Sequence, residues 1–354
     1  MKLRLPAEWE KQAFVQIAWP HIETDWLPYL EAAHKCYCQL AAEISKRENL
    51  IIVTPDPADV TARLEATDGV VMENVHVLCI DTNDTWARDH AFLTCIDEEN
   101  GCKVLEDFCF NGWGQKFASN FDNQINERVL PWLQKHFEGQ VGYMDVRRIV
   151  LEGGSVESDG EGTILTTTSC LLAPNRNYFA DKTEAEEVLR ATLGAKQVLW
   201  LDHSWLDGDD TDGHIDTVAR LCPNNTIAYV QCSDKNDIHY KELSAMEQEL
   251  KLLKTAQGNP YKLLALPMAP AIFEKDFSNP VEGEEEQRLP ATYANFLIMN
   301  GAVLMPTYGQ PETDKKAMDV LQEAFPDREI VGIDCQVLIR QHGSLHCITM
   351  QYPE

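Results

Sequence analysis

Short strand-like runs alternate with single amphipathic helices along the whole of this 354-residue chain. This alternation constrains the fold to the α/β class, because a helix between strands returns the chain to the same sheet. We therefore predict repeated ββαβ units, although no residue-level repeat is visible in the sequence. The runs with strand composition are Val15–Trp19, Leu50–Thr54, Val75–Ile80, Gln197–Leu201, Ile227–Gln231 and Ala302–Met305.

Four helices have recognisable ends. Apolar residues spaced by three and four predict one helix over residues 26–47. Thr183 and Glu186 form a capping-box pair that predicts a helix through Leu193, with Gly194 as its left-handed stop. Two further helices are predicted from Leu243 to near Gly258 and from Asp314 to Phe325, and the acidic run Val281–Arg288 is predicted to be a solvated loop.

Composition indicates one catalytic domain over residues 1–354, because the hydrophobic content is 44% and no linker interrupts it. The 57 acidic and 30 basic residues give a net charge of −27, which disfavours nucleic acid and anionic membranes as partners and favours small cations. Eleven scattered cysteines, with neither a secretion signal nor a run of ~20 apolar residues, predict a reducing cytoplasm. A homo-oligomer remains open.

Several side chains form a set suited to nucleophilic catalysis. Cys347 follows the small-residue turn at Gly343–Ser344 and begins an apolar run. His214 and Asp216 stand two residues apart, which in a strand would place them on one face. With Asp89 and Glu152, they supply a thiol, an imidazole and three carboxylates.

The order of short motifs along the chain resembles that of the agmatine deiminase family, within the guanidine-modifying pentein superfamily. The motifs are Pro6–Glu10, Trp19–His21, Trp86–His90, Phe110–Lys116, Glu152–Ser155, Cys170–Asn177, Asp209–Asp216 and Leu345–Thr349. The resemblance implies an α/β propeller of five ββαβ modules around a pseudo-fivefold axis, with the active site in the central cavity. It also implies conversion of agmatine to N-carbamoylputrescine and ammonia, a step of polyamine biosynthesis, without a cofactor or a metal.

The resemblance implies a role for each candidate residue. Cys347 would be the nucleophile and His214 the general acid and base, with Glu152 orienting and charging the ring. Asp89 and Asp216 would bind the guanidinium, while Asp210 would bind the distal amine and Trp86 or Trp113 would pack on the methylenes.

The expected chemistry is covalent, because a guanidinium carbon is a poor electrophile and water attacks it too slowly. A free thiol is only a few per cent thiolate at neutral pH, and neighbouring carboxylates lower that fraction further. A bound guanidinium within ~4 Å would contribute up to ~4 kcal/mol toward ionisation at an effective dielectric constant near 20. We therefore expect Cys347 to ionise mainly in the complex with substrate.

Three other functions stay open. Peptidyl-arginine and free arginine are alternative substrates for the same chemistry. The run Asp212–Asp216 imitates the Asp-x-His-x-Asp metal spacing of ureohydrolases, although the second aspartate-rich ligand run of that family is missing after residue 237. A non-catalytic polyamine binder would have lost the nucleophile or the base, and this chain keeps both Cys347 and His214.

Overall fold

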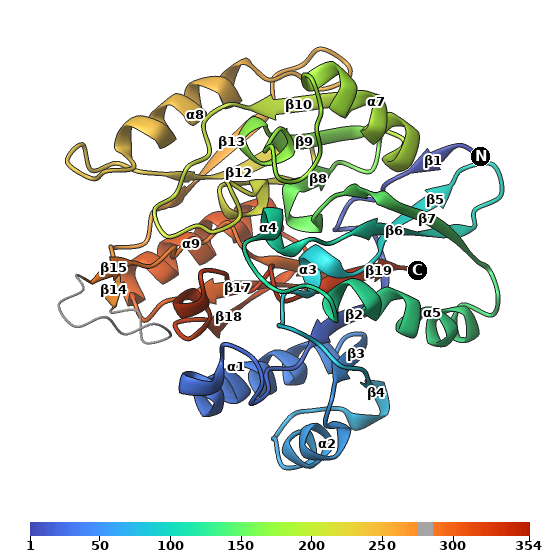
Figure 1. Cartoon of the computed structure of the whole chain (residues 1–354). Coiled ribbons are helices and arrows are strands. Elements are labelled where there is room, and N and C mark those ends of the chain that lie inside the picture. The colour runs from blue at the N-terminus through green and yellow to red at the C-terminus, as the bar shows by residue number, and fades with distance from the viewer. Residues whose placement is uncertain (275–285) are drawn as a thin grey trace.

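Five of the six sheets formed by the described residues share one plan, in which two antiparallel strands are followed by a helix and a third strand parallel to the second. The structure, a computed structural model, describes residues 1–274 and 286–354. The five ββαβ modules predicted for the chain are therefore confirmed. In Figure 1 the sheets lie around the centre of the molecule, where the short helices α3 (Ala87–His90) and α4 (Gly112–Gln115) are drawn.

The sheets follow one another along the chain with two exceptions. The C-terminal strand completes the first sheet, and the N-terminal strand joins the second. The strand order of the first sheet is β19 (Met350–Pro353), β2 (Gln12–Ala18), β3 (Asn49–Thr54) and β4 (Val75–Cys79). The second sheet contains β1 (Leu3–Arg4), β5 (Leu93–Asp97), β6 (Lys103–Cys109) and β7 (Val141–Val150). The remaining three contain β8 (Val156–Ser158), β9 (Thr163–Thr167) and β10 (Gln197–Leu201); β11 (Ala219–Cys222), β12 (Thr226–Gln231) and β13 (Lys262–Pro267); and β16 (Leu297–Met299), β17 (Ala302–Thr307) and β18 (Glu329–Asp334).

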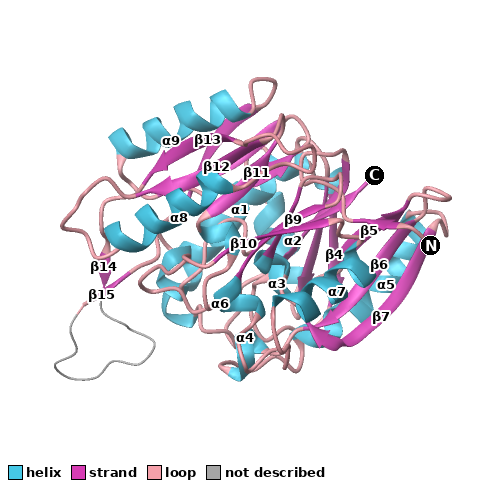
Figure 2. Cartoon of the chain, turned by 90° about the horizontal axis from the view of Figure 1, so that it is seen from above, coloured by secondary structure: helices cyan, strands magenta, loops and turns pink. Residues whose placement is uncertain are grey.

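Helix α8 (Tyr240–Leu252) packs on β12 of its own sheet, whereas α9 (Pro311–Ala324) lies against β12 and β13 of the neighbouring sheet as well as β17 and β18 of its own (Figure 2). The central strands β2, β3, β12 and β17 are buried on both faces, which explains their largely apolar composition. The longer helices are α1 (Leu30–Ser45), α2 (Pro57–Glu65), α5 (Ile125–His136), α7 (Lys182–Leu193), α8 (Tyr240–Leu252) and α9 (Pro311–Ala324), and α6 (Thr168–Leu171) is a single turn.

The six predicted strands and four predicted helices all form, with small changes at their ends. Gly194 is the left-handed stop of α7, with φ of 68°. The predicted capping box is wrong, because the N-cap of α7 is Asp181, whose carboxylate accepts hydrogen bonds from the amides of Thr183 and Glu184. Helix α8 ends at Leu252, earlier than predicted.

The predicted solvated loop is only partly described, since residues 281–285 lie outside the described residues. Gln287–Arg288 forms β15, which pairs with β14 (Phe273–Glu274), so the loop prediction is wrong there. Arg288 binds the carboxylate of Asp237 with its guanidinium, which anchors the strand. No helix among the described residues is both long and apolar enough to cross a membrane.

Candidate active site

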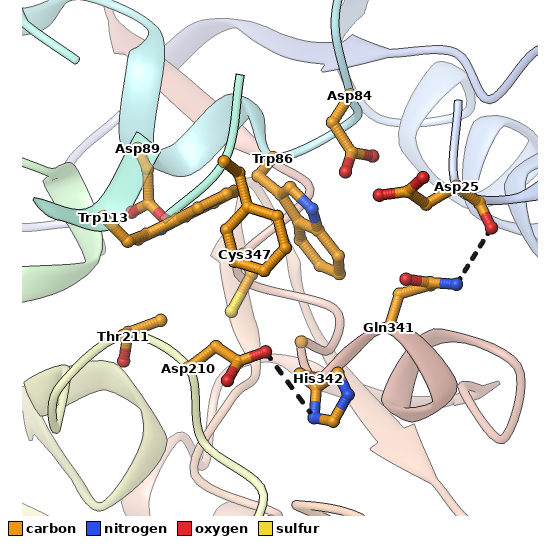
Figure 3. Close-up of a pocket in the computed structure, with 12 residues that line it drawn as sticks. Asp25, Asp84, Trp86, Asp89, Trp113, Asp210, Thr211, Gln341, His342 and Cys347 are labelled. Atoms are coloured by element: carbon orange, nitrogen blue, oxygen red, sulfur yellow. Dashed lines mark hydrogen bonds and ion pairs between the residues drawn. The ribbon is translucent and has the colours of Figure 1, made fainter. Parts of the chain in front are cut away.

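An acidic cavity of about 210 Å³ reaches the sulfur of Cys347 (Figure 3). None of its lining residues, all of which fall in the described ranges, is lysine or arginine. The lining therefore suits a small cation. The lining residues are Asp25, Asp84, Trp86, Asp89, Trp113, Phe117, Asp210, Thr211, Gln341, His342, Gly343 and Cys347.

Cys347 is held by contacts to its backbone and to its sulfur. Asn295 Oδ1 accepts hydrogen bonds from the Cys347 amide at 3.3 Å and from its thiol at 3.4 Å. The sulfur also lies 3.9 Å from Oδ2 of Asp216. Burial raises the pKa of the Cys347 thiol well above its ordinary value, and the charges of Asp216 and Asp89 raise it further. The free protein therefore holds Cys347 as a thiol.

The side chains of His214, Asp89 and Asp216 converge on the backbone of Gly154. A β-carbon on Gly154 would lie 2.5 Å from His214 Nδ1, 2.9 Å from Asp89 Oδ1 and 3.1 Å from Asp216 Oδ2. Only glycine fits at this close approach. Since Asp216 also touches the sulfur of Cys347, the imidazole, two carboxylates and the thiol share one small space.

His214 is fully buried, and neither ring nitrogen has a hydrogen-bond partner among the described residues. Burial lowers the pKa of His214 to about 3, although the charge of Asp216 opposes this effect. The ring is therefore neutral in the free protein and is able to accept a proton. Its Nδ1 atom lies 3.7 Å from Oδ1 of Asp89.

Two hydrogen-bond donors fix the carboxylate of Asp89 at the wall of the cavity. Trp113 Nε1 donates to Asp89 Oδ2 at 2.9 Å, and the Gly154 amide donates to Asp89 Oδ1 at 3.0 Å. Burial raises the pKa of Asp89 well above its ordinary value, and the charges of Asp216 and Glu152 add to this effect. A cation entering between Asp89 and Asp216 would relieve their repulsion.

His346 connects Asp216 to a buried network of charges. Its Nδ1 lies 2.7 Å from Asp216 Oδ2, and its Nε2 lies 2.8 Å from Glu8 Oε2. Glu8, Glu157 and His346 could each offer a ligand atom to a metal ion, but Arg220 binds both glutamates and so occupies the space among the three residues. Burial raises the pKa of Asp216, but the hydrogen bond and charge of His346 outweigh it, so the pKa is lowered and the carboxylate is ionised.

Glu152 is paired with an arginine. Arg176 Nε lies 2.8 and 2.9 Å from the two oxygens of Glu152, while its terminal nitrogens bind the carboxylate of Asp212 and the carbonyl of Thr211. Burial raises the pKa of Glu152, and the charge of Arg176 opposes that effect. The carboxylate lies within 4.8 Å of a ring nitrogen of His214, close enough for an electrostatic effect on the ring, but it forms no hydrogen bond that would orient the ring as expected.

Comparisons with known proteins place the chain in a family. Residues 4–353 match the family of Porphyromonas-type peptidyl-arginine deiminases. The chain belongs to this family. A curated relative, "Putative agmatine deiminase" of Marinomonas sp. (strain MWYL1), is 31% identical over 358 residues, covering 99% of this chain and 94% of the relative.

Two solved structures of similar proteins match the fold of this chain over nearly its whole length. The "Putative Arginine Deiminase from Porphyromonas gingivalis" is 46% identical with a TM-score of 0.89, and covers 100% of this chain and 99% of that one. Agmatine deiminase from C. jejuni with substrate bound is 35% identical with a TM-score of 0.86, and the match covers 99% and 96% of the two chains. A dimethylarginine dimethylaminohydrolase, 11% identical with a TM-score of 0.51, shares the pentein fold alone.

In this deiminase family member, the residues singled out from the sequence lie together, but one detail differs from the prediction. His214 and Asp216 are not on a strand, because Ile215–Thr217 is a turn of 3₁₀ helix. Asp212 does not join them in a ligand set, since its carboxylate binds Arg176 and Lys116. The Asp-x-His-x-Asp spacing therefore does not build the ureohydrolase arrangement.

Other cavity and supporting residues were not found from the sequence. Asp25 and Asp84 line the cavity on the side away from Asp210, whose carboxylate lies 3.8 Å from His342 Nδ1 (Figure 3). Asn295 accepts a hydrogen bond from the thiol of Cys347 but lies in none of the sequence motifs. His346 and Arg176 do lie in these motifs, but the motifs predicted no catalytic or binding role for either residue.

Proposed function

We propose that this protein hydrolyses the guanidine group of agmatine, giving N-carbamoylputrescine and ammonia. The observation that carries the proposal is the meeting of a thiol, a neutral imidazole and two carboxylates at one end of an acidic cavity. The printed names of several relatives, which are agmatine deiminases, support the choice of substrate.

In the proposed reaction, Asp89 and Asp216 hold the guanidinium by its edges, since the fork of a guanidinium matches carboxylates in geometry and charge. The bound cation offsets the charges that suppress ionisation of Cys347. The thiol then passes its proton to His214, whose neutral ring is ready to accept it.

The thiolate adds to the guanidinium carbon and forms a carbon–sulfur bond. His214 gives its proton to one nitrogen, the carbon–nitrogen bond breaks, and ammonia leaves a thiouronium bound to Cys347. A water molecule then adds to the same carbon while His214 takes its proton. Collapse of this adduct breaks the carbon–sulfur bond and releases the ureido product. The hydroxyl proton of the adduct passes to the sulfur, which returns Cys347 as a thiol, and His214 releases its proton to solvent, where the ammonia takes it up. Glu152 stabilises the charged form of His214 through their proximity.

The lining of the cavity favours agmatine over free arginine. Free arginine carries a carboxylate, and no lysine or arginine of the described chain lines the cavity to pair with it. We assign Asp210 to the distal amine, and Trp86 and Trp113 to the methylenes. Both aromatic rings are buried at the cavity wall.

The proposal extends to the setting of the enzyme. All eleven cysteines are free thiols, which supports a reducing cytoplasm. The net charge of −27 supports a small cationic partner in place of nucleic acid. Residues 1–354 act together as one catalytic domain, because Asp89, His214 and Cys347 lie in segments that connect different sheets.

The test is to incubate the wild type and the Cys347→Ala variant with agmatine, free arginine and an arginyl peptide. Ammonia, urea and ureido product are quantified for each pair. We expect ammonia and ureido product from agmatine with the wild type, and at least about a thousandfold less with Cys347→Ala. Urea as the product would refute deimination, while preference for the arginyl peptide would refute the substrate. Cys95→Ala, at a buried position in β5, is the matched control.

A second variant tests the assignment of Asp210. Asp210→Asn should raise KM for agmatine about tenfold and leave KM for a guanidine with a neutral tail almost unchanged. An equal loss for both substrates would contradict the assignment.

A further inference from the structure

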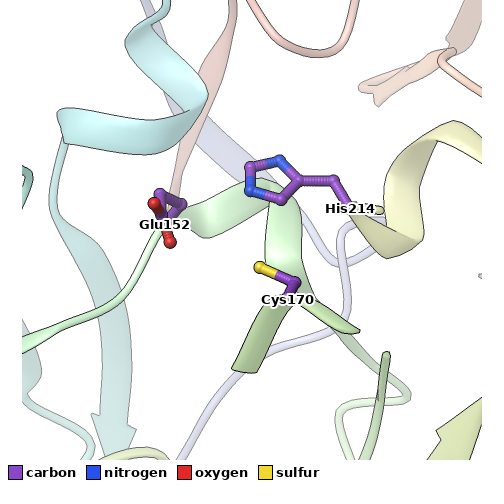
Figure 4. Close-up of side chains that lie close together, drawn as sticks. All are labelled: Glu152, Cys170 and His214. Atoms are coloured by element: carbon purple, nitrogen blue, oxygen red, sulfur yellow. The ribbon is translucent and has the colours of Figure 1, made fainter. Parts of the chain in front are cut away.

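A second cysteine lies beside the proposed general base. Cys170, in α6, His214 and Glu152 place one donor atom each within 4.8 Å of one another, and all three residues are buried. Figure 4 shows the sulfur of Cys170 and the ring of His214 both directed toward the carboxylate of Glu152. The reaction proposed above gives Cys170 no task.

The three donors match the ligands of zinc. Thiolate sulfur, imidazole nitrogen and carboxylate oxygen bind Zn²⁺ at about 2.0–2.3 Å, so the donors of a tetrahedral site lie roughly 3.3–3.7 Å apart. The donor atoms lie within 4.8 Å of one another, so a tetrahedral ion requires them to approach by at most about 1.1–1.5 Å. A set of three protein ligands leaves the fourth position for water.

Glu152, Cys170 and His214 each also have lone pairs with which to coordinate a metal ion. Both nitrogens of His214 are buried without a hydrogen-bond partner among the described residues, which is costly for polar atoms. Arg176 contacts both oxygens of Glu152, and its charge also acts on Cys170 and His214, so an ion must compete with this guanidinium. A carboxylate has about four lone-pair sites, which lets Glu152 bind the ion beside Arg176. Burial raises the pKa of Cys170 well above its ordinary value, so the thiol keeps its proton until a metal displaces it.

We propose that Glu152, Cys170 and His214 form an inhibitory site for a zinc-like divalent cation. On binding, the thiol of Cys170 loses its proton to solvent and the sulfur coordinates the ion. The ion occupies the nitrogen of His214 that the reaction needs, and so stops proton transfer. The entry path passes Asp89, which lines the cavity and lies 3.7 Å from His214. The inhibition rests on the proposed function, whereas the binding does not.

Binding is tested with Co²⁺, whose complexes with thiolates absorb in the near ultraviolet. The Cys347→Ala variant is titrated first, so that the nucleophile cannot supply the sulfur. We expect one Co²⁺ per chain with thiolate-to-metal absorption, displaced by Zn²⁺. The absorption should disappear in Cys347→Ala/Cys170→Ala and in Cys347→Ala/Cys170→Ser, and should persist in Cys347→Ala/Cys95→Ala.

Inhibition is tested in chains that keep Cys347. Zn²⁺ should inhibit the wild type and Cys95→Ala, and a chelator should restore activity. Cys170→Ala should keep its basal activity and tolerate at least about tenfold more Zn²⁺. Absence of thiolate absorption in Cys347→Ala, or its persistence after loss of Cys170, would overturn the site. Loss of deiminase activity in every assay would refute the proposed function and leave the Co²⁺ result unaffected.

Discussion

Replacing Asp216 by asparagine should make Cys347 more reactive toward a neutral alkylating agent while it abolishes catalysis. The carboxylate lies 3.9 Å from the sulfur, and its charge opposes ionisation of the thiol. At an effective dielectric constant near 20, two charges at this distance interact by about 4 kcal/mol, which corresponds to a roughly thousandfold change in the thiolate fraction. His346 neutralises part of the charge of Asp216, so the expected gain in thiolate is about tenfold to a thousandfold.

The reaction rate should rise less than the thiolate fraction does. The nucleophilicity of a thiolate falls as its pKa falls, with a Brønsted coefficient of about 0.4–0.5, which removes about half of the gain on a logarithmic scale. We therefore expect Asp216→Asn to react about 3- to 30-fold faster with iodoacetamide near pH 7.

The rate is followed for Cys347 alone by peptide mass mapping, because ten other cysteines are present. Asp107→Asn is the matched control, since Asp107 is also buried but bonds to Asn126 and Tyr143 away from the cavity. Asp89→Asn gives a second test of the same charge effect. Equal or slower alkylation in folded Asp216→Asn, verified by circular dichroism, would refute the electrostatic reasoning.

Three further predictions concern single positions. Gly154→Ala should lower kcat at least about a hundredfold, because the added β-carbon displaces the ring of His214. Gly142→Ala is the control and should keep normal kinetics, since its β-carbon would meet nothing closer than 3.7 Å. Equal kinetics in the two variants would contradict the close approach at Gly154. Trp113→Phe keeps an aromatic ring but removes the hydrogen bond to Asp89, so KM for the guanidine should rise about ten- to a hundredfold, and an unchanged KM would exclude this role. Burial raises the pKa of Glu106 to about 8, so the folded protein keeps a proton on this carboxyl that the unfolded chain releases above about pH 4.3. The contribution of Glu106 to the free energy of unfolding should therefore fall by about 1.4 kcal/mol per pH unit between about pH 5 and 8. Urea unfolding should therefore show Glu106→Gln gaining stability over the wild type as pH rises, and a constant difference would refute the assignment.

The fold was predictable from the sequence because its information is local. Apolar spacing identified the helices, and short β-rich runs identified strands buried on both faces. The N-cap of α7 was missed because Asp181 and Thr183 both have capping side chains two residues apart, and only the backbone geometry distinguishes them.

The candidate site was predictable only as far as its motifs reached. Cys347, His214, Asp89 and Asp216 lie in short motifs, so resemblance identified them together. Asn295 lies in none, and its role depends on a contact with residues about fifty positions away. The pairing of Glu152 with Arg176, and the aspartates across the cavity from Asp210, likewise depend on long-range packing that composition and spacing do not encode.

The pairing of β19 with β2 has a consequence for how the enzyme acquires activity. Met350 lies opposite Gln16, so the first sheet is completed only when segments from opposite ends of the sequence meet. Pairings over such separations form slowly in folding, because the entropy of closing the intervening loop must be overcome first. Cys347 stands three residues before Met350, and therefore reaches His214 only at this closure. During refolding from urea, helical signal should thus return before turnover does. Partly folded chains should carry a Cys347 thiol that is alkylated but catalyses no turnover, because the burial and the carboxylates that raise its pKa in the native protein are not yet in place.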